Sequence, residues 1–170
     1  MLLRATMTAL LTPLAVVGVA TTADANDPWQ PAPQGSLTLP AERYCGDFDL
    51  RADPIRDAVE QRVVESYDSG APRVVAYRGA LLVELTNLTT GATAQVSLSG
   101  HSTATLREDG TMETYETNGP VGMGWPAGTA GLDAGFYLLN GRHVVGFAPD
   151  GSRTMVVDQG SESDLCERVS

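Results

Sequence analysis

GFYLLNGRHVVGFA, residues 135–148, carries the clearest β-hairpin signal in the chain. Apolar and polar residues alternate on both sides of Asn140-Gly141. An Asn-Gly pair strongly favours a two-residue hairpin, because a type I′ turn needs a positive φ at both central residues. We therefore expect two antiparallel strands that meet at Asn140-Gly141. In that register, one face carries Phe136, Leu138, His143, Val145 and Phe147.

The same pattern of short alternating segments and turn signals recurs along the chain. Four more turn signals separate such segments: Ser69-Gly70, Thr89-Thr90-Gly91, Asp109-Gly110 and Pro149-Asp150-Gly151. Strands that recur at this spacing are typical of an antiparallel barrel or sandwich. Consecutive hairpins favour the barrel, so we expect an all-β, antiparallel up-and-down barrel of about 8–10 strands. A two-sheet β-sandwich is the alternative.

Two segments are less regular. Asp53 could cap a helix that begins at Pro54, but Val63-Val64 is β-branched and runs directly into a turn signal. Over Asp53–Val64 we favour a strand that contains Val63-Val64, with only the first turn helical, and leave the longer helix as the alternative. Near the C-terminus, residues 161–168 could form one short helical turn.

The N-terminus has the three parts of a secretory signal peptide. Arg4 supplies a positive charge, residues 7–20 are uncharged and largely apolar, and Ala23-Asp24-Ala25 offers small residues at the positions that a signal peptidase reads. The apolar run is too short to span a bilayer and contains a proline. We expect cleavage near Ala25, a secreted product and no membrane span after cleavage.

The remaining chain divides into a tail and one domain. Residues 26–41 hold four prolines, and we expect them to form an extended tail before a single β domain over residues 42–170. The only two cysteines, Cys45 and Cys166, lie near the two ends of that domain. In an exported protein such a pair predicts a disulfide that closes the domain.

The charge of the chain excludes some partners. The sequence has 21 acidic and 11 basic residues and a net charge of −10, and every basic residue is an arginine. Nucleic acids and anionic membranes both require a cationic surface. We therefore expect neither as a partner, and the sequence leaves the oligomeric state open.

The turn motifs resemble those of a known group of proteins. They are Cys45-Gly46, Leu85-Thr86-Asn87-Leu88-Thr89-Thr90-Gly91, Ser99-Gly100, Asp109-Gly110, Asn140-Gly141, Asp150-Gly151 and Asp164-Leu165-Cys166. Over residues 45–170 the chain resembles a family of exported actinobacterial all-β proteins with no established function. It departs from that pattern at residues 51–60. The resemblance implies the fold and the export, and it carries over no site residue.

No catalytic motif stands out. The sequence has no G-x-S-x-G and no H-E-x-x-H motif, and its only histidines are His101 and His143. With both cysteines expected in a disulfide, we predict no catalytic residue, no metal site and no cofactor. The alternative is a secreted hydrolase or isomerase that uses His101 or His143 with a nearby Asp or Ser.

A binding role is favoured instead. Residues 119–135 hold six glycines and two prolines, so we expect an irregular loop in which Met123 and Trp125 either form a flap or plug the core. His143 is either a core histidine bonded to a carbonyl or carboxylate, or a polar group in an apolar cavity. The candidate ligand site comprises His143, Phe136, Leu138, Trp125 and Met123. We predict an exported, non-enzymatic domain that binds a small apolar molecule or an envelope component.

Overall fold

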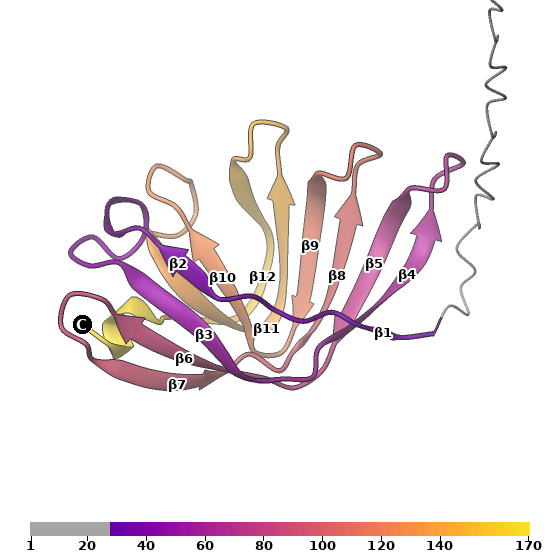
Figure 1. Cartoon of the computed structure of the whole chain (residues 1–170). Helices are drawn as coiled ribbons and strands as arrows, with labels where there is room; N and C mark the ends of the chain where they lie inside the picture. The colour runs from indigo at the N-terminus through magenta and orange to yellow at the C-terminus, as the bar shows by residue number, and fades with distance from the viewer. Residues whose placement is uncertain (1–27) are drawn as a thin grey trace, which may run out of the picture.

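The computed structural model describes residues 28–170, which form an all-β fold of two antiparallel sheets (Figure 1). The predicted signal peptide, residues 1–25, lies outside the described residues. The larger sheet has eight strands: β1 (Gln30–Pro31), β4 (Glu60–Ser66), β5 (Pro72–Arg78), β8 (His101–Leu106), β9 (Met112–Asn118), β10 (Val121–Trp125), β11 (Gly135–Phe147) and β12 (Arg153–Asp164). The smaller sheet has four strands: β2 (Leu37–Leu39), β3 (Leu50–Asp57), β6 (Leu81–Asn87) and β7 (Thr93–Ser97).

The chain passes between the sheets through short links, β3 to β4, β5 to β6 and β7 to β8. At one of these links Gly79 has a φ of +133°, and a Cβ there would lie 2.1 Å from the carbonyl oxygen of Ala58. Only glycine fits this position, because the two bending strands approach each other so closely. The backbone N–H of Ala58 donates to the carbonyl of Ala80 at 2.8 Å, which joins the two bends.

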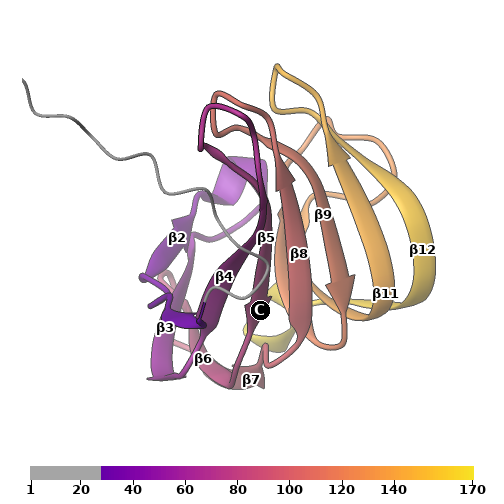
Figure 2. The same cartoon turned by 90° about the vertical axis from the view of Figure 1, so that its right-hand side faces the viewer.

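The strands form two separate sheets that are not closed into a barrel, so the predicted up-and-down barrel is wrong. In the larger sheet β4, β5, β8, β9 and β11 follow one another, and β9 and β10 share one edge of β11 while β12 occupies the other. The bends divert β3, β6 and β7 into a second sheet, which is seen at the lower left of Figure 2. Buried residues of this sheet pack against Phe136 and Leu138 of β11. The fold has two separate antiparallel sheets, as the sandwich alternative requires.

Most of the predicted turns are confirmed. Ser69-Gly70 joins β4 to β5, Thr89-Thr90-Gly91 joins β6 to β7, and Asp109-Gly110 joins β8 to β9. Pro149-Asp150-Gly151 joins β11 to β12, with Val144 opposite Val157. Val63-Val64 lie in a strand, β4, as favoured. The helical first turn expected at Pro54 is wrong, because Asp53 and Pro54 belong to β3 and pair with β6.

The predicted hairpin at Asn140-Gly141 is wrong. β11 runs without reversal from Gly135 to Phe147, and Gly141 pairs with Gly160 of β12. Gly141 does have a positive φ of +115°, but a Cβ there would lie 2.6 Å from the carbonyl oxygen of Gln159. The glycine therefore permits a close approach of two strands and forms no turn.

The continuous strand also changes which side chains share a face. Phe136 and Leu138 pack in or against one core cluster, formed with the smaller sheet and the C-terminus: Leu39, Phe48, Leu50, Ala52, Val83, Leu85, Val96, Leu165, Cys166 and Val169. Leu139 and Val145 belong to a second cluster with Met123, Trp125 and Tyr137. Since residues alternate along a strand, His143 shares the face of Leu139 and Val145, and the predicted grouping with Phe136 and Leu138 is wrong.

The predicted disulfide is confirmed. Cys45 and Cys166 are joined, with an S–S distance of 2.02 Å and Cα atoms 5.5 Å apart. Cys45 follows the 3₁₀ turn η1 (Ala41–Arg43), and Cys166 begins the 3₁₀ turn η2 (Cys166–Arg168). Both cysteines pack with the first core cluster, so the bond fixes the two ends of the domain to its core.

The proline-rich segment is extended and pairs with the domain at two places. β1 pairs with β4, and β2 pairs with β3. In Figure 1 this segment runs across the front of the strands from β4 to β3. Trp29 lies under two guanidinium groups, with Arg78 at 4.1 Å and Arg62 at 4.9 Å from its ring.

Candidate functional site

A groove of about 790 Å³ lies between the two sheets. Its walls come from the bends between the sheets, from β10 and from the proline-rich segment. The apolar lining residues are Pro31, Ala32, Pro33, Leu37, Ala52, Pro54, Val59, Leu81, Val83, Leu98, Met112, Val121, Met123, Phe136 and Phe147. Ligand pockets commonly have volumes of about 300–1,000 Å³ and predominantly apolar walls, so this groove has the size and the composition of a small-molecule site.

Charge in the groove is opposite to that of the chain. The lining residues include two arginines, Arg78 and Arg153, and no aspartate or glutamate. The chain as a whole has a net charge of −10. A cationic lining in an acidic protein is a local feature that favours an anionic group on a ligand.

The two arginines differ in their partners. Arg78 forms an ion pair with Glu60 at 3.1 Å and stacks on Trp29, so its charge is already neutralised. Arg153 makes no ion pair with any carboxylate among residues 28–170. Its guanidinium lies over the ring of Phe147 at 5.3 Å and donates to the carbonyl oxygen of Gly124.

The local environment of Arg153 explains its electrostatics. Burial lowers the pKa of this half-buried guanidinium from its usual value, because the charged form loses solvation. Its Nε atom is buried and has no hydrogen-bond partner in the described structure. An anion that reached Arg153 would supply both the missing charge partner and a hydrogen-bond acceptor.

Three polar side chains lie on the wall of the larger sheet. Tyr115 donates a hydrogen bond from its hydroxyl to Oγ of Ser102 at 2.7 Å, and Tyr77 lines the groove beside them. Burial raises the pKa of both tyrosines. Both therefore remain neutral near pH 7 and can take part in hydrogen bonds without adding negative charge.

The sequence-predicted site residues separate into two groups. Met123 and Phe136 line the groove, whereas Trp125, Leu138 and His143 do not. Trp125 is fully buried in the second core cluster, which agrees with the interpretation that it plugs the core. The loop expected over residues 119–135 is also shorter than predicted, because Val121–Trp125 forms β10.

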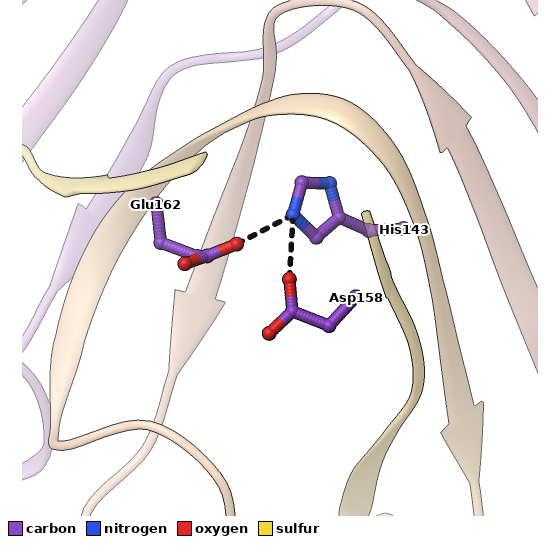
Figure 3. Close-up of side chains that lie close together, drawn as sticks. All are labelled: His143, Asp158 and Glu162. Carbon is purple, nitrogen blue, oxygen red and sulfur yellow. Dashed lines mark hydrogen bonds and ion pairs between the residues drawn. The ribbon is translucent and has the colours of Figure 1, made fainter. Parts of the chain in front are cut away.

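His143 is buried and contacts two carboxylates of β12 (Figure 3). Its Nε2 lies 2.6 Å from Oε1 of Glu162 and 3.4 Å from Oδ1 of Asp158. Neither histidine has a serine or threonine hydroxyl as a hydrogen-bond partner in the described structure, and His101 is exposed. His143 therefore has carboxylate partners, as the hydrolase or isomerase alternative allows, but no hydroxyl partner.

Sequence reasoning missed Arg153 and the two carboxylates. Every arginine is equally charged in the sequence, and only the fold shows which one faces a groove without a carboxylate beside it. Asp158 and Glu162 lie in a polar run, VVDQGSESD, that carries no strong strand pattern. The sequence predicts the start of β12 after the turn at Pro149-Asp150-Gly151, but only the pairing with β11 shows that the strand continues to Asp164.

Comparison with known proteins adds no family. No family model, no curated protein and no solved structure matches the chain. Within residues 28–170, no helix is long and apolar enough to span a membrane.

Proposed function

We propose that this chain is an exported, non-enzymatic binding protein that holds a small amphipathic acid in the groove between its two sheets. The observation that carries the proposal is the lining of the groove, which is predominantly apolar and contains an arginine, Arg153, without a carboxylate partner among residues 28–170. The expected ligand has an apolar tail and a carboxylate or similar acidic head.

The head group is assigned to Arg153 because this arginine is the better of the two anion sites. Its partners are an aromatic face and a backbone carbonyl, neither of which neutralises its charge. Arg78 would first have to release Glu60. A hydrogen bond that involves a charged group contributes about 1.5–3 kcal/mol, so the loss of Arg153 should weaken binding of an acid by about tenfold or more.

The tail is assigned to the apolar wall formed by the bends and the proline-rich segment. Prolines 31 and 33 and Leu37 face the groove from the segment, and Val59, Leu81 and Leu98 face it from the bends. Each methylene that enters such an environment contributes about 0.8 kcal/mol, or about fourfold in Kd. Affinity should therefore rise steadily with tail length until the groove is full.

Export is supported by the disulfide and by the N-terminal sequence. The disulfide joins two cysteines that are 121 positions apart in the sequence. Structural disulfides are typical of oxidising compartments. Neither histidine bonds to a serine or threonine hydroxyl in the described structure, so there is no Ser–His pair, and this favours binding over catalysis by such a pair.

The proposal is tested with two ligand series. Straight-chain carboxylates of increasing length, and alcohols of the same lengths, are titrated into the protein by isothermal calorimetry. We expect carboxylates to bind more tightly than alcohols, with about fourfold tighter binding for each added methylene up to a limit. Equal affinities for acid and alcohol would contradict the role of Arg153.

Two variants locate the site. Arg153→Gln should weaken the carboxylates about tenfold and leave the alcohols nearly unchanged. Arg142→Gln is the matched control, because Arg142 is exposed, pairs with Glu116 and lies outside the groove lining. Val121→Trp replaces a half-buried groove residue with a larger one and should weaken both series. Binding that survives Val121→Trp unchanged would place the ligand elsewhere.

A further inference from the structure

Outside the groove, one histidine and two carboxylates converge on the hairpin of β11 and β12. His143 comes from β11, and Asp158 and Glu162 come from β12 (Figure 3). One ligand atom from each residue lies within 4.8 Å of the others. We infer that these three residues form a binding site for a first-row transition-metal dication, of which Zn²⁺ is the representative.

The spacing of the three atoms fits a metal ion. Metal–nitrogen and metal–oxygen distances of about 2.0–2.2 Å place the ligand atoms around one zinc ion roughly 3.0–3.5 Å apart. Asp158 Oδ1 is already 3.4 Å from His143 Nε2. Glu162 Oε1 is 2.6 Å from the same nitrogen, so this flexible side chain has to move outward.

Counting protons also favours an ion at this position. Nε2 of His143 carries at most one hydrogen, and Glu162 at 2.6 Å is the better acceptor for it. The carboxylate of Asp158 then faces the same nitrogen without a hydrogen to accept. No arginine among residues 28–170 forms an ion pair with either carboxylate. A dication would bind all three atoms and balance both negative charges.

Local backbone features position the histidine against β12. Gly160 lies between Asp158 and Glu162, and a Cβ at that position would lie 2.7 Å from Cε1 of His143. A side chain at residue 160 would therefore displace the imidazole ring. The register also shifts beside the site, where Val144 pairs with Val157 but Val145 pairs with Met155. This β-bulge sets the face on which Asp158 lies, as bulges near functional sites commonly do.

The site is fixed on one side and open on the other. The side chain of His143 is fully buried, whereas those of Asp158 and Glu162 are 55% and 22% exposed. An ion can therefore enter from solvent on the side of the two carboxylates and reach the buried nitrogen. Water can then complete its coordination shell, as in zinc sites with three protein ligands.

An acidic hollow adjoins the site. It has a volume of about 680 Å³ and is lined by Asp133, Tyr137, Glu162, Ser163, Asp164, Glu167 and Arg168. Four carboxylates against one arginine concentrate cations at this surface, and Glu162 belongs to both the hollow and the metal site.

The ligand types select the class of metal. Calcium and magnesium prefer oxygen ligands alone, whereas imidazole nitrogen suits zinc, copper, iron and nickel. A set of one nitrogen and two carboxylate oxygens therefore favours a first-row dication over Ca²⁺. Zn²⁺ is the appropriate probe because it has no redox chemistry of its own.

The test titrates Zn²⁺ into the full chain by isothermal calorimetry. We expect one ion per chain, no comparable binding of Ca²⁺, and a Kd that is at least tenfold weaker in Asp158→Asn and in Glu162→Gln. Asp158 is exposed, so its substitution should leave the fold intact. Asp68→Asn is the matched control, because Asp68 is also exposed and lies in the distant turn between β4 and β5.

Nuclear magnetic resonance of the imidazoles identifies the ligand atom. The chain has only two histidines, so Zn²⁺ should shift the ring nitrogen signals of His143 and leave those of His101 unchanged. Zinc that shifts His101, or that binds equally well to Asp158→Asn, would overturn the assignment. So would absence of zinc binding together with a His143 ring protonated on both nitrogens at pH 7, since the cluster would then be an imidazolium held by two carboxylates.

Discussion

Removal of the disulfide between Cys45 and Cys166 should destabilise the domain strongly. The two cysteines are separated by 121 residues, so the bond closes nearly the whole domain into one loop. In the chain-entropy model, a loop of that length lowers the entropy of the unfolded chain by about 16 cal/mol/K, or about 5 kcal/mol at 25 °C. Domains of this size have unfolding free energies of about 5–15 kcal/mol, so the loss is a large part of the total.

The assay compares guanidinium unfolding of the oxidised protein with that of the double variant Cys45→Ala/Cys166→Ala. We expect a loss of about 3–5 kcal/mol and a steeper dependence on denaturant, because the unfolded chain expands when the bond is absent. The reduced wild-type protein is the control for packing, since it keeps both sulfur atoms. A loss below about 1 kcal/mol with an unchanged slope would refute the reasoning.

Three further substitutions test the packing of the core, the close approach of β11 and β12, and the pH dependence of stability. Leu50→Ala empties a fully buried site and should cost about 2–5 kcal/mol in denaturant unfolding, whereas Leu88→Ala, at a residue 49% exposed, should cost about 0.5 kcal/mol or less. Gly160→Ala would place a Cβ 2.2 Å from a backbone carbonyl oxygen, so Tm should fall in a thermal melt; an unchanged Tm would contradict the close approach. Hydrogen bonds from Thr111 lower the pKa of Asp109 below its ordinary value of 3.8, so its contribution is present above that value and is lost as pH falls through the folded pKa. The stability difference between wild type and Asp109→Asn should therefore be constant from pH 5 to 7 and shrink in acid, and a difference that grows in acid would contradict this sign.

Local signals in the sequence predicted the features that depend on a few neighbouring residues. Asp109-Gly110 forms its turn because a single glycine at φ +82° is sufficient to reverse the chain. The strand at Val63-Val64 and the disulfide were predicted for similarly direct reasons. In each case the relevant physics is contained in a short segment or in a pair of unique residues.

The features that sequence reasoning missed depend on distant partners. Asn140-Gly141 has the composition of a turn, but Gly141 uses its positive φ to admit Gly160, which comes opposite it only when β12 pairs with β11. The division into two sheets likewise depends on Gly79 meeting Ala58 at a bend. Neither contact is visible in a local pattern.

The same distinction applies to the candidate sites. The sequence indicated Met123 and Phe136, which line the groove, because apolar residues in a β protein tend to face its interior. It could not indicate that Arg153 lacks a carboxylate partner. It also could not indicate that His143 meets Asp158 and Glu162, because the shifted register of β11 and β12 determines that contact.

The central claim, that the groove carries an amphipathic acid, is tested most directly by native mass spectrometry of the mature protein, purified without denaturant from its own host. We predict an added mass that disappears on denaturation, extracts as an amphipathic acid, and is absent from Val121→Trp purified in the same way. A wild-type mass equal to the polypeptide less two hydrogens, or an added mass that Val121→Trp carries equally, would contradict the claim.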